Sequence, residues 1–192
     1  MSLVWPCLLS IPAYVRAGRT TTAPAAACPT CGTQLAPAGG YFRQLRTNGE
    51  RYQIWIERRR CKPCNATHAL LPDFVVANHA DTVDDIAAAI DGSTTRLPAT
   101  TVAGWRRRFR QNRPALRSGL AAATVAFGGS PALGDVREAL EELRAVLVDR
   151  WDDGFPTSWR LLNVMSGMSW VQSRVKSFWT GVGRVPAPAR AP

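Results

Sequence analysis

The sequence has 192 residues, of which 46% are hydrophobic, and this is enough for one ordinary folded domain or two small ones. The 24 lysines and arginines outnumber the 14 aspartates and glutamates, so the formal net charge is +10 and the sequence pI is about 10.4. This composition excludes a chain that is disordered throughout, and the positive charge favours an acidic polymer or surface as the partner.

The first part of the chain, residues 1–27, predicts a loosely ordered arm. Its apolar start, MSLVWPCLLSIPAYVRAGR, lacks the basic n-region of a signal peptide, and Pro6 and Pro12 interrupt it. It is also shorter than the roughly 20 apolar residues that a membrane span needs. The small residues and proline of TTTAPAAA are typical of a linker. We therefore expect a cytoplasmic protein without a membrane partner, in a compartment where thiols stay reduced.

Four of the five cysteines form two C-x2-C pairs, CPTC and CKPC. Gly32 and Asn65 follow the pairs, where the backbone must bend so that amide hydrogens can face the sulfur atoms. Paired C-x2-C motifs are typical of zinc sites, whereas four reduced buried cysteines or a redox pair are the alternatives. The predicted ligands of one structural Zn2+ are Cys28, Cys31, Cys61 and Cys64. Cys7 is left over.

Between the cysteine pairs the sequence predicts a β-hairpin, so residues 28–76 are interpreted as a zinc ribbon. YFRQL and RYQIWIERRR are the expected strands, and Asn48-Gly49 is the expected turn. A zinc ion with four protein ligands has no open position for water, so the metal is expected to be structural. It would hold a small sheet that buries too little surface to be stable alone. His68 could act as a zinc ligand in place of one cysteine, but the four cysteines already fill the four positions.

Arginines and aromatic residues alternate along this hairpin, as on surfaces that bind nucleic acids. The aromatic residues are Tyr41, Phe42, Tyr52 and Trp55. The arginines that we expect to contact DNA are Arg58, Arg59 and Arg60. The alternative is that the aromatic residues form the core of the ribbon and the arginines its solvated rim.

After the ribbon, residues 80–114 predict a helix-turn-helix-like segment. In DTVDDIAAAI, Thr82 is the expected N-cap and Asp85 stands three residues later, as in a capping box. Gly92 stands just past the expected end, where a left-handed residue is common. These signals predict a short first helix.

The second helix of this segment is strongly basic. In PATTVAGWRRRFRQNRP the apolar residues recur at i, i+3 and i+7, and Pro114 is expected to end the helix. The side chains that are expected to contact DNA are Thr101, Arg106, Arg107, Arg110 and Arg113. The alternative is a basic helix that faces solvent or packs on a partner.

The C-terminal part predicts a helical hairpin after a linker. Residues 115–134 are rich in Ala, Gly and Ser, which favours the linker. Residues 135–180 contain an amphipathic helix with a leucine stripe and a second helix that is expected to end near Trp179. The tryptophans of this hairpin favour a packed core, with a homodimer surface as the alternative. Residues 181–192 predict a disordered tail.

Two quoted stretches carry a resemblance to a known family. The stretch from CPTCG through YFRQLRTNGERYQIWIERRRCKPCNATHALLPDFV, followed by TTVAGWRRRF, resembles the N-terminal zinc-ribbon and helix-turn-helix region of bacterial transposases. It is most similar to an uncharacterised actinobacterial zinc-ribbon family associated with them, over about residues 28–112. The four cysteines, RRRC and THALLPDF are the most specific matches. The resemblance implies zinc ligation by the four cysteines and binding to transposon-end DNA or a related target.

The chain departs from a complete transposase because the acidic residues after residue 112 cluster on one helix and its exit turn, unlike those of an RNase-H-like catalytic domain. No P-loop or dinucleotide fingerprint is present in the sequence, so we expect no enzyme. The sequence therefore predicts a small α+β fold: a zinc-ribbon β-hairpin, helix-turn-helix-like helices and a C-terminal helical hairpin. We expect a non-catalytic DNA-binding protein that is transposon-associated or regulatory. The alternatives are a module that docks a transposase or polymerase, and an inactive remnant of a mobile element.

Overall fold

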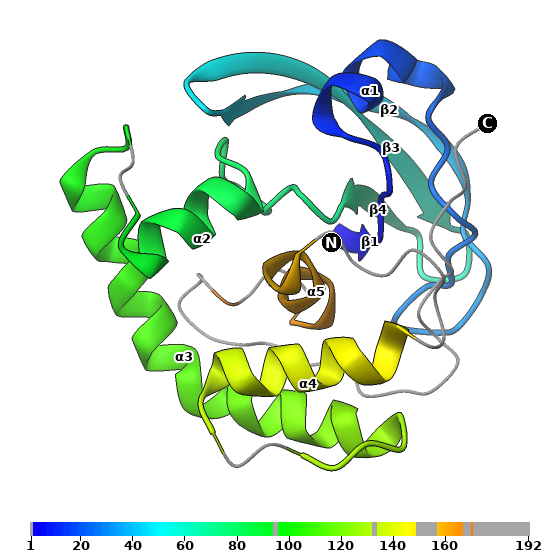
Figure 1. Cartoon of the computed structure of the whole chain (residues 1–192). Helices are drawn as coiled ribbons and strands as arrows, with labels where there is room; N and C mark the ends of the chain where they lie inside the picture. Colours follow the sequence, from blue (N-terminus) through cyan, green and yellow to red (C-terminus); the bar gives the residue numbers. More distant parts are fainter. Residues whose placement is uncertain (1, 94–95, 132–133, 149–156, 167–169, 171–192) are drawn as a thin grey trace.

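Four strands and five α-helices make up the described part of the chain, which has a small α+β fold (Figure 1). The structure is a computed structural model and describes residues 2–93, 96–131, 134–148, 157–166 and 170. In chain order the elements are β1 (Ser2–Trp5), α1 (Ile11–Ala17), a short 3-10 turn (Gly18–Thr20), β2 (Ala36–Thr47), β3 (Glu50–Cys61), β4 (Ala66–Pro72), α2 (Val83–Asp91), α3 (Ala99–Ala126), α4 (Val136–Val148) and α5 (Ser158–Met165).

The strands form one sheet in the order β1-β4-β3-β2. β2 and β3 are the predicted antiparallel hairpin, and both are longer than the sequence indicates. Asn48 and Gly49 form its turn with φ angles of 50° and 84°, which confirms the prediction from the Asn-Gly pair. One face of the hairpin is covered by the main hydrophobic core, where Leu45, Ile54 and Ile56 are fully buried.

The N-terminal segment is ordered, so the prediction of a loosely ordered arm over residues 1–27 is wrong. β1 pairs in parallel with β4, and α1 lies against β3 near the top of Figure 1. Trp5 and Tyr14 are buried, and the Tyr14 hydroxyl donates to the Trp55 carbonyl oxygen at 2.8 Å. Pro12 lies in the first turn of α1, where its missing N–H costs nothing. Burial against distant residues stabilises a segment that looks loosely ordered by local composition.

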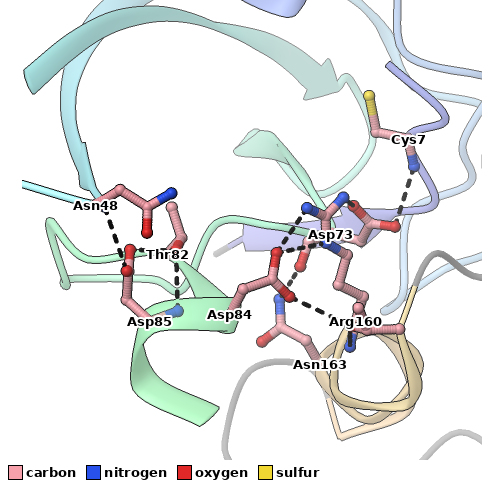
Figure 2. Close-up of polar contacts among 9 residues, drawn as sticks. Cys7, Asn48, Asp73, Thr82, Asp84, Asp85, Arg160 and Asn163 are labelled. Atoms are coloured by element: carbon pink, nitrogen blue, oxygen red, sulfur yellow. Dashed lines mark hydrogen bonds and ion pairs between the residues drawn. The ribbon is translucent and has the colours of Figure 1, made fainter. Parts of the chain in front are cut away.

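α2 begins and ends where its local signals predict. The Thr82 hydroxyl accepts a hydrogen bond from the Asp85 amide at 3.1 Å, and Gly92 has a φ of 89° in the left-handed region. The Asp85 carboxylate also accepts a bond from the Asn48 amide at 3.4 Å (Figure 2). The cap of α2 is therefore joined to the turn of the β2–β3 hairpin.

α3 continues through Pro114, which contradicts both the predicted helix end and the predicted linker over residues 115–134. A proline inside a helix removes one backbone hydrogen bond and costs about 3 kcal/mol. Beyond it, Leu116, Leu120 and Ala123 are fully buried, and α3 packs against α4. Burying each leucine contributes about 1.5–3 kcal/mol, which offsets the cost of the proline. Neither α3 nor another helix among the described residues has the combined length and apolar character of a membrane span.

α4 and α5 form the C-terminal helical region. The Asp135 carboxylate caps α4 because it accepts hydrogen bonds from the Arg137 and Glu138 amides at 2.8 and 3.3 Å. Apolar side chains of both helices join those of the sheet, α2 and α3 in the main core. Most of the predicted second hairpin helix up to Trp179, and the predicted tail over residues 181–192, lie outside the described residues.

A buried polar cluster fastens α5 to the sheet and to α2 (Figure 2). Arg160 of α5 donates to the Asp84 carboxylate at 2.7 Å and lies 3.7 Å from the Asp73 carboxylate. Asp73 accepts a bond from the Cys7 amide at 3.3 Å, and the Asn163 side chain donates to the Asp73 carbonyl oxygen at 2.8 Å. Burial raises the pKa of Asp73 to about 7, although Arg160 opposes this rise. Burial also raises the pKa of Cys7 to about 12, so this remaining cysteine is a buried thiol of the core.

Candidate metal centre and arginine surfaces

The four paired cysteines converge at one end of the sheet. Cys28 and Cys31 belong to the turn before β2, Cys61 ends β3, and Cys64 lies in the turn before β4. Their sulfur atoms all lie within 4.8 Å of one another. All four are free cysteines, without a disulfide bond. The β2–β3 hairpin therefore brings together two turns that are far apart in the sequence.

The backbone of each turn follows the predicted geometry. The Cys28 amide donates to the Thr33 carbonyl oxygen at 2.8 Å, and the Gly32 amide donates to the Cys28 carbonyl oxygen at 2.8 Å. In the second turn, the Asn65 amide donates to the Lys62 carbonyl oxygen at 3.2 Å. Gly32 and Asn65 have φ angles of 73° and 50°, which few other residues adopt without strain. Both turns thus hold their cysteine pairs through local bonds.

The sulfur spacing fits a tetrahedral metal ion. Four sulfurs at about 2.3 Å from a central zinc are separated by roughly 3.8 Å from one another. The Cys28 and Cys64 sulfurs are 3.9 Å apart, and the Cys31 and Cys61 sulfurs are 3.4 Å apart. A disulfide needs about 2.05 Å, so these pairs are not oxidised. The set can hold one metal ion by small shifts of the sulfur atoms.

The ionisation of the four thiols is linked. Hydrogen bonding with the hydroxyl and amide of Thr33 lowers the pKa of Cys31 to about 6. Hydrogen bonding with Cys31 and Cys61 raises the pKa of Cys64 to about 12. Four thiolates at this distance repel one another, so some sulfurs keep their protons when no cation neutralises them. Metal binding is therefore expected to release protons from the cluster.

His68 of β4 lies beside the four sulfurs. Its Nε2 is 3.8 Å from the Cys28 sulfur, and its side chain is buried. Its Nδ1 has no hydrogen-bond partner among the described residues. An Nε2–H group at this position can donate to the Cys28 sulfur, as residues behind a metal ligand commonly do. The histidine that is surplus in the sequence is therefore a neighbour of the centre.

The four-cysteine cluster is not the only support of the sheet, whereas the sequence predicts a sheet that buries too little surface to be stable without zinc. Cys28, Leu35 and Cys61 form a small buried cluster apart from the main core. Ile54 and Ile56 of β3 belong to the main core, together with side chains from α2 to α5. The sheet thus shares the main core with the helices. The cluster organises only the cysteine-bearing end.

The three predicted DNA-binding arginines of β3 point in different directions. Arg58 and Arg60 are exposed, whereas Arg59 lies on the opposite face and is buried. Arg59 donates to the Glu57 carboxylate at 2.7 Å and to the Ala23 carbonyl oxygen at 2.6 Å. Strand alternation separates neighbours in sequence, and the N-terminal segment covers the face that holds Arg59. The prediction that Arg59 contacts DNA is therefore contradicted by its burial.

The predicted DNA-contacting arginines of α3 differ in their bonding partners. Arg107 and Arg110 are exposed and have no ion-pair partner in the described part of the chain. The Arg106 side chain donates to the Ala89 carbonyl oxygen at 2.8 Å and so caps the end of α2. Arg113 lies 3.4 Å from the Asp135 carboxylate. Of these predicted contacts, Arg107 and Arg110 have neither a carboxylate nor a carbonyl partner in the described part of the chain.

The remaining predicted contact of α3, Thr101, is partly exposed in its first turn. The end of β3 that carries Arg58 and Arg60 is on the right of Figure 1, whereas the first half of α3 descends along the left side. The two predicted groups of DNA-contacting residues therefore lie on different parts of the molecule. The structure does not bring them together.

Two of the aromatic residues that the sequence singles out, Phe42 and Trp55, form a cluster with Arg19 that sequence reasoning did not predict. Phe42 and Trp55 are cross-strand partners whose ring centres are 5.3 Å apart. The Arg19 guanidinium lies 5.5 and 5.1 Å from the centres of these two rings. Gly40 leaves room for the indole, because a Cβ there would meet Trp55 at 2.4 Å. The alternation of β3 predicted where Trp55 points, but nothing local indicated that Arg19 would cover it.

The comparisons with known proteins are limited to one family. Residues 28–108 match a family that is described as a domain of unknown function, DUF6431. The match contains all four cysteines and α2, and it ends within α3 just after Arg107. It covers less than half of the chain. No curated protein and no solved structure matches the sequence. The similarity to transposases stays a prediction from the quoted motifs.

Proposed function

We propose that this protein is a zinc-stabilised DNA-binding protein without catalytic activity. The observation that carries the proposal is the pair of exposed, uncompensated arginines on α3, Arg107 and Arg110. They belong to a chain with a net charge of +10. Cations without carboxylate partners can neutralise phosphates and release the counterions that surround DNA. A transposon-associated or regulatory role follows from the sequence resemblance and stays a prediction.

The exposed side of α3 supplies the expected DNA contact. Val102, Trp105 and Phe109 bury the opposite side of the helix in the core, so the arginines keep a fixed orientation. An α-helix fits the major groove of B-DNA, and partly exposed Thr101 is in the turn that would approach base edges in a helix-turn-helix arrangement. Arginine side chains would bind the flanking phosphates. The preceding α2, which is capped by Arg106, supports the start of this helix.

Zinc is the metal that the four cysteines support best. A tetrahedral set of four thiolates favours zinc or an iron–sulfur centre over magnesium or calcium, which prefer oxygen ligands. With all four positions filled by protein, a bound zinc ion would be structural and would have no open position for a substrate. Its role in the proposal is to hold the end of the hairpin in one shape.

The proposal is tested by zinc content and by a salt-dependent titration with duplex DNA. We expect one zinc per chain and an affinity that falls steeply as salt rises. Arg107→Ala should weaken binding and reduce the slope of log K against log salt by about one. Arg16→Ala is the matched control, because Arg16 is an exposed arginine on α1. A zinc-loaded wild-type chain that does not bind duplex DNA at low salt would overturn the proposal.

A second candidate is a protein-docking module for a transposase or polymerase. It is favoured by Tyr41 and Phe42, which are 40% and 48% exposed on β2, an edge strand of the sheet. Exposed aromatic residues are common in protein interfaces. Zinc loading with heparin binding but without retention of duplex DNA would favour this candidate.

A further inference from the structure

A pocket lies where the end of α2, the middle of α3 and the start of α4 meet. Its volume is about 480 Å³, within the range of about 300–1,000 Å³ that is typical of ligand sites. Ile90, Phe109 and Val136 supply its apolar lining. Phe109 and Val136 belong to the main core, so the inner wall is anchored by packing. The pocket is thus formed by three helices that are separated in the sequence.

Four arginines line the same pocket. Arg106, Arg110 and Arg113 recur at i, i+4 and i+7 along α3 and therefore share one side of the helix. Arg137 comes from the first turn of α4 and lines the same pocket. Arg107 is not among the lining residues, although it is adjacent in sequence to Arg106. The tertiary structure therefore divides the arginines of α3 into a pocket group and an outward group.

The charges of the pocket do not cancel. Its two carboxylates are Asp91, which pairs with Arg137, and Asp135, which lies 3.4 Å from Arg113. Arg106 binds a neutral carbonyl oxygen, and Arg110 has no ion-pair partner in the described residues. Two guanidinium charges are therefore left over. Both ion pairs are partly exposed, so they hold their arginines weakly and leave donors available to an incoming anion.

We propose that this pocket binds a phosphate group. Guanidinium groups match phosphate oxygens in charge and geometry, because their planar N–H groups can donate two parallel hydrogen bonds to one phosphate. The source of the phosphate is the DNA backbone, and this part of the proposal rests on the proposed DNA-binding function. Arg110 is the central contact because no carboxylate competes for it. Bound backbone phosphate would place the adjoining DNA along α3.

The test measures binding of inorganic phosphate to the zinc-loaded full chain by isothermal titration calorimetry, with ionic strength held constant by sodium chloride. We expect saturable binding, and Arg110→Ala should raise the Kd at least tenfold. Arg110 is exposed, so this variant should fold, which an unchanged circular dichroism spectrum would verify. Arg16→Ala is the neutral control, since Arg16 lies on α1 outside the pocket. Arg107→Ala should keep phosphate binding while it weakens DNA binding.

A competition titration separates the two possible sources of phosphate. If phosphate displaces duplex DNA from the wild-type chain but not from Arg110→Ala, the pocket holds a backbone phosphate. If phosphate binds through Arg110 and the wild-type chain does not bind DNA, the phosphate site is supported but its DNA source is overturned, together with the proposed function. If Arg110→Ala binds DNA as tightly as the wild-type chain and phosphate gives no saturable heat, the pocket proposal is overturned while the proposed function stands.

Discussion

The Arg59 guanidinium donates to the Glu57 carboxylate at 2.7 Å, and both side chains lie beneath the N-terminal segment. Glu57 in turn accepts a bond from the Ala23 amide at 2.9 Å, while Arg59 donates to the Ala23 carbonyl oxygen at 2.6 Å. This pair therefore fastens the segment before the cysteines to the middle of the sheet. Its two neighbours in the sequence, Arg58 and Arg60, remain exposed.

Replacement of Arg59 should reduce the stability of the fold without weakening DNA binding. Arg59→Ala strands the Glu57 charge at a site where its side chain is 16% exposed, so we expect a loss of about 3 kcal/mol in the free energy of unfolding. Arg58→Ala should change it by less than about 0.5 kcal/mol, because that side chain is exposed. Urea denaturation of both zinc-loaded variants measures the difference. Equal stabilities for the two variants would show that the pair is not structural.

Removal of the metal should loosen the cysteine end and spare the main core. The small cluster around Cys28 and Cys61 is separate from the main core that holds α2. After chelation we expect amide hydrogen exchange to rise strongly in residues 28–35 and 61–65, with little change in residues 83–91. Mass spectrometry of peptides from the metal-loaded and chelated protein makes this comparison. Collapse of protection across all three ranges would mean that the metal supports the whole fold.

The N-terminal strand should be necessary for stability. Trp5 is 5% exposed in the main core, and its indole N–H has no hydrogen-bond partner among the described residues. Trp5→Ala should therefore cost about 3–5 kcal/mol of unfolding free energy. Trp5→Phe keeps an aromatic ring and removes the unpaired donor, so it should cost clearly less. Arg16→Ala, at an exposed position of α1, is the neutral control in thermal unfolding. If Trp5→Ala left the stability unchanged, the original prediction of a loosely ordered arm would be supported instead.

Asp73 should make stability fall as the pH rises from about 4 to 7. Burial raises its folded pKa to about 7, against an unfolded value near 3.9, so the folded state binds more protons in this window. The derivative of the unfolding free energy with pH is then negative for this group. The charged and titratable groups around it, Arg160, Asp84 and Cys7, remain in the variant Asp73→Asn.

Denaturation of Asp73→Asn and wild type across this pH window isolates the contribution of the carboxyl group. The fall with pH should be smaller in the variant. Asp135→Asn is the control because Asp135 is about half exposed and asparagine caps a helix as well as aspartate does. Parallel pH profiles of wild type and Asp73→Asn would contradict the raised pKa.

Features that depend on a few adjacent residues were predictable from the sequence. The two cysteine turns, the Asn48-Gly49 hairpin turn and the Thr82 cap of α2 appear where they are expected. Each is determined by local backbone preferences or by a short-range hydrogen bond, so nearby residues contain the necessary information. The spacing of the cysteines also predicted that they would meet, because a hairpin joins the two turns.

Only the tertiary structure decided the features that depend on distant partners. α3 continues through Pro114 because its later residues are buried against other elements. Arg59 cannot contact DNA because the N-terminal segment covers it. The arginine pocket likewise exists because the fold brings Arg110 of α3 and Arg137 of α4 into one lining. The local turns, the cysteine set and the positive charge follow from the order of the residues alone. Residues far along the chain determine which arginines face solvent, because they bury some parts of the surface and leave others open. The free energy of this burial depends on tertiary packing and not on neighbours in the sequence.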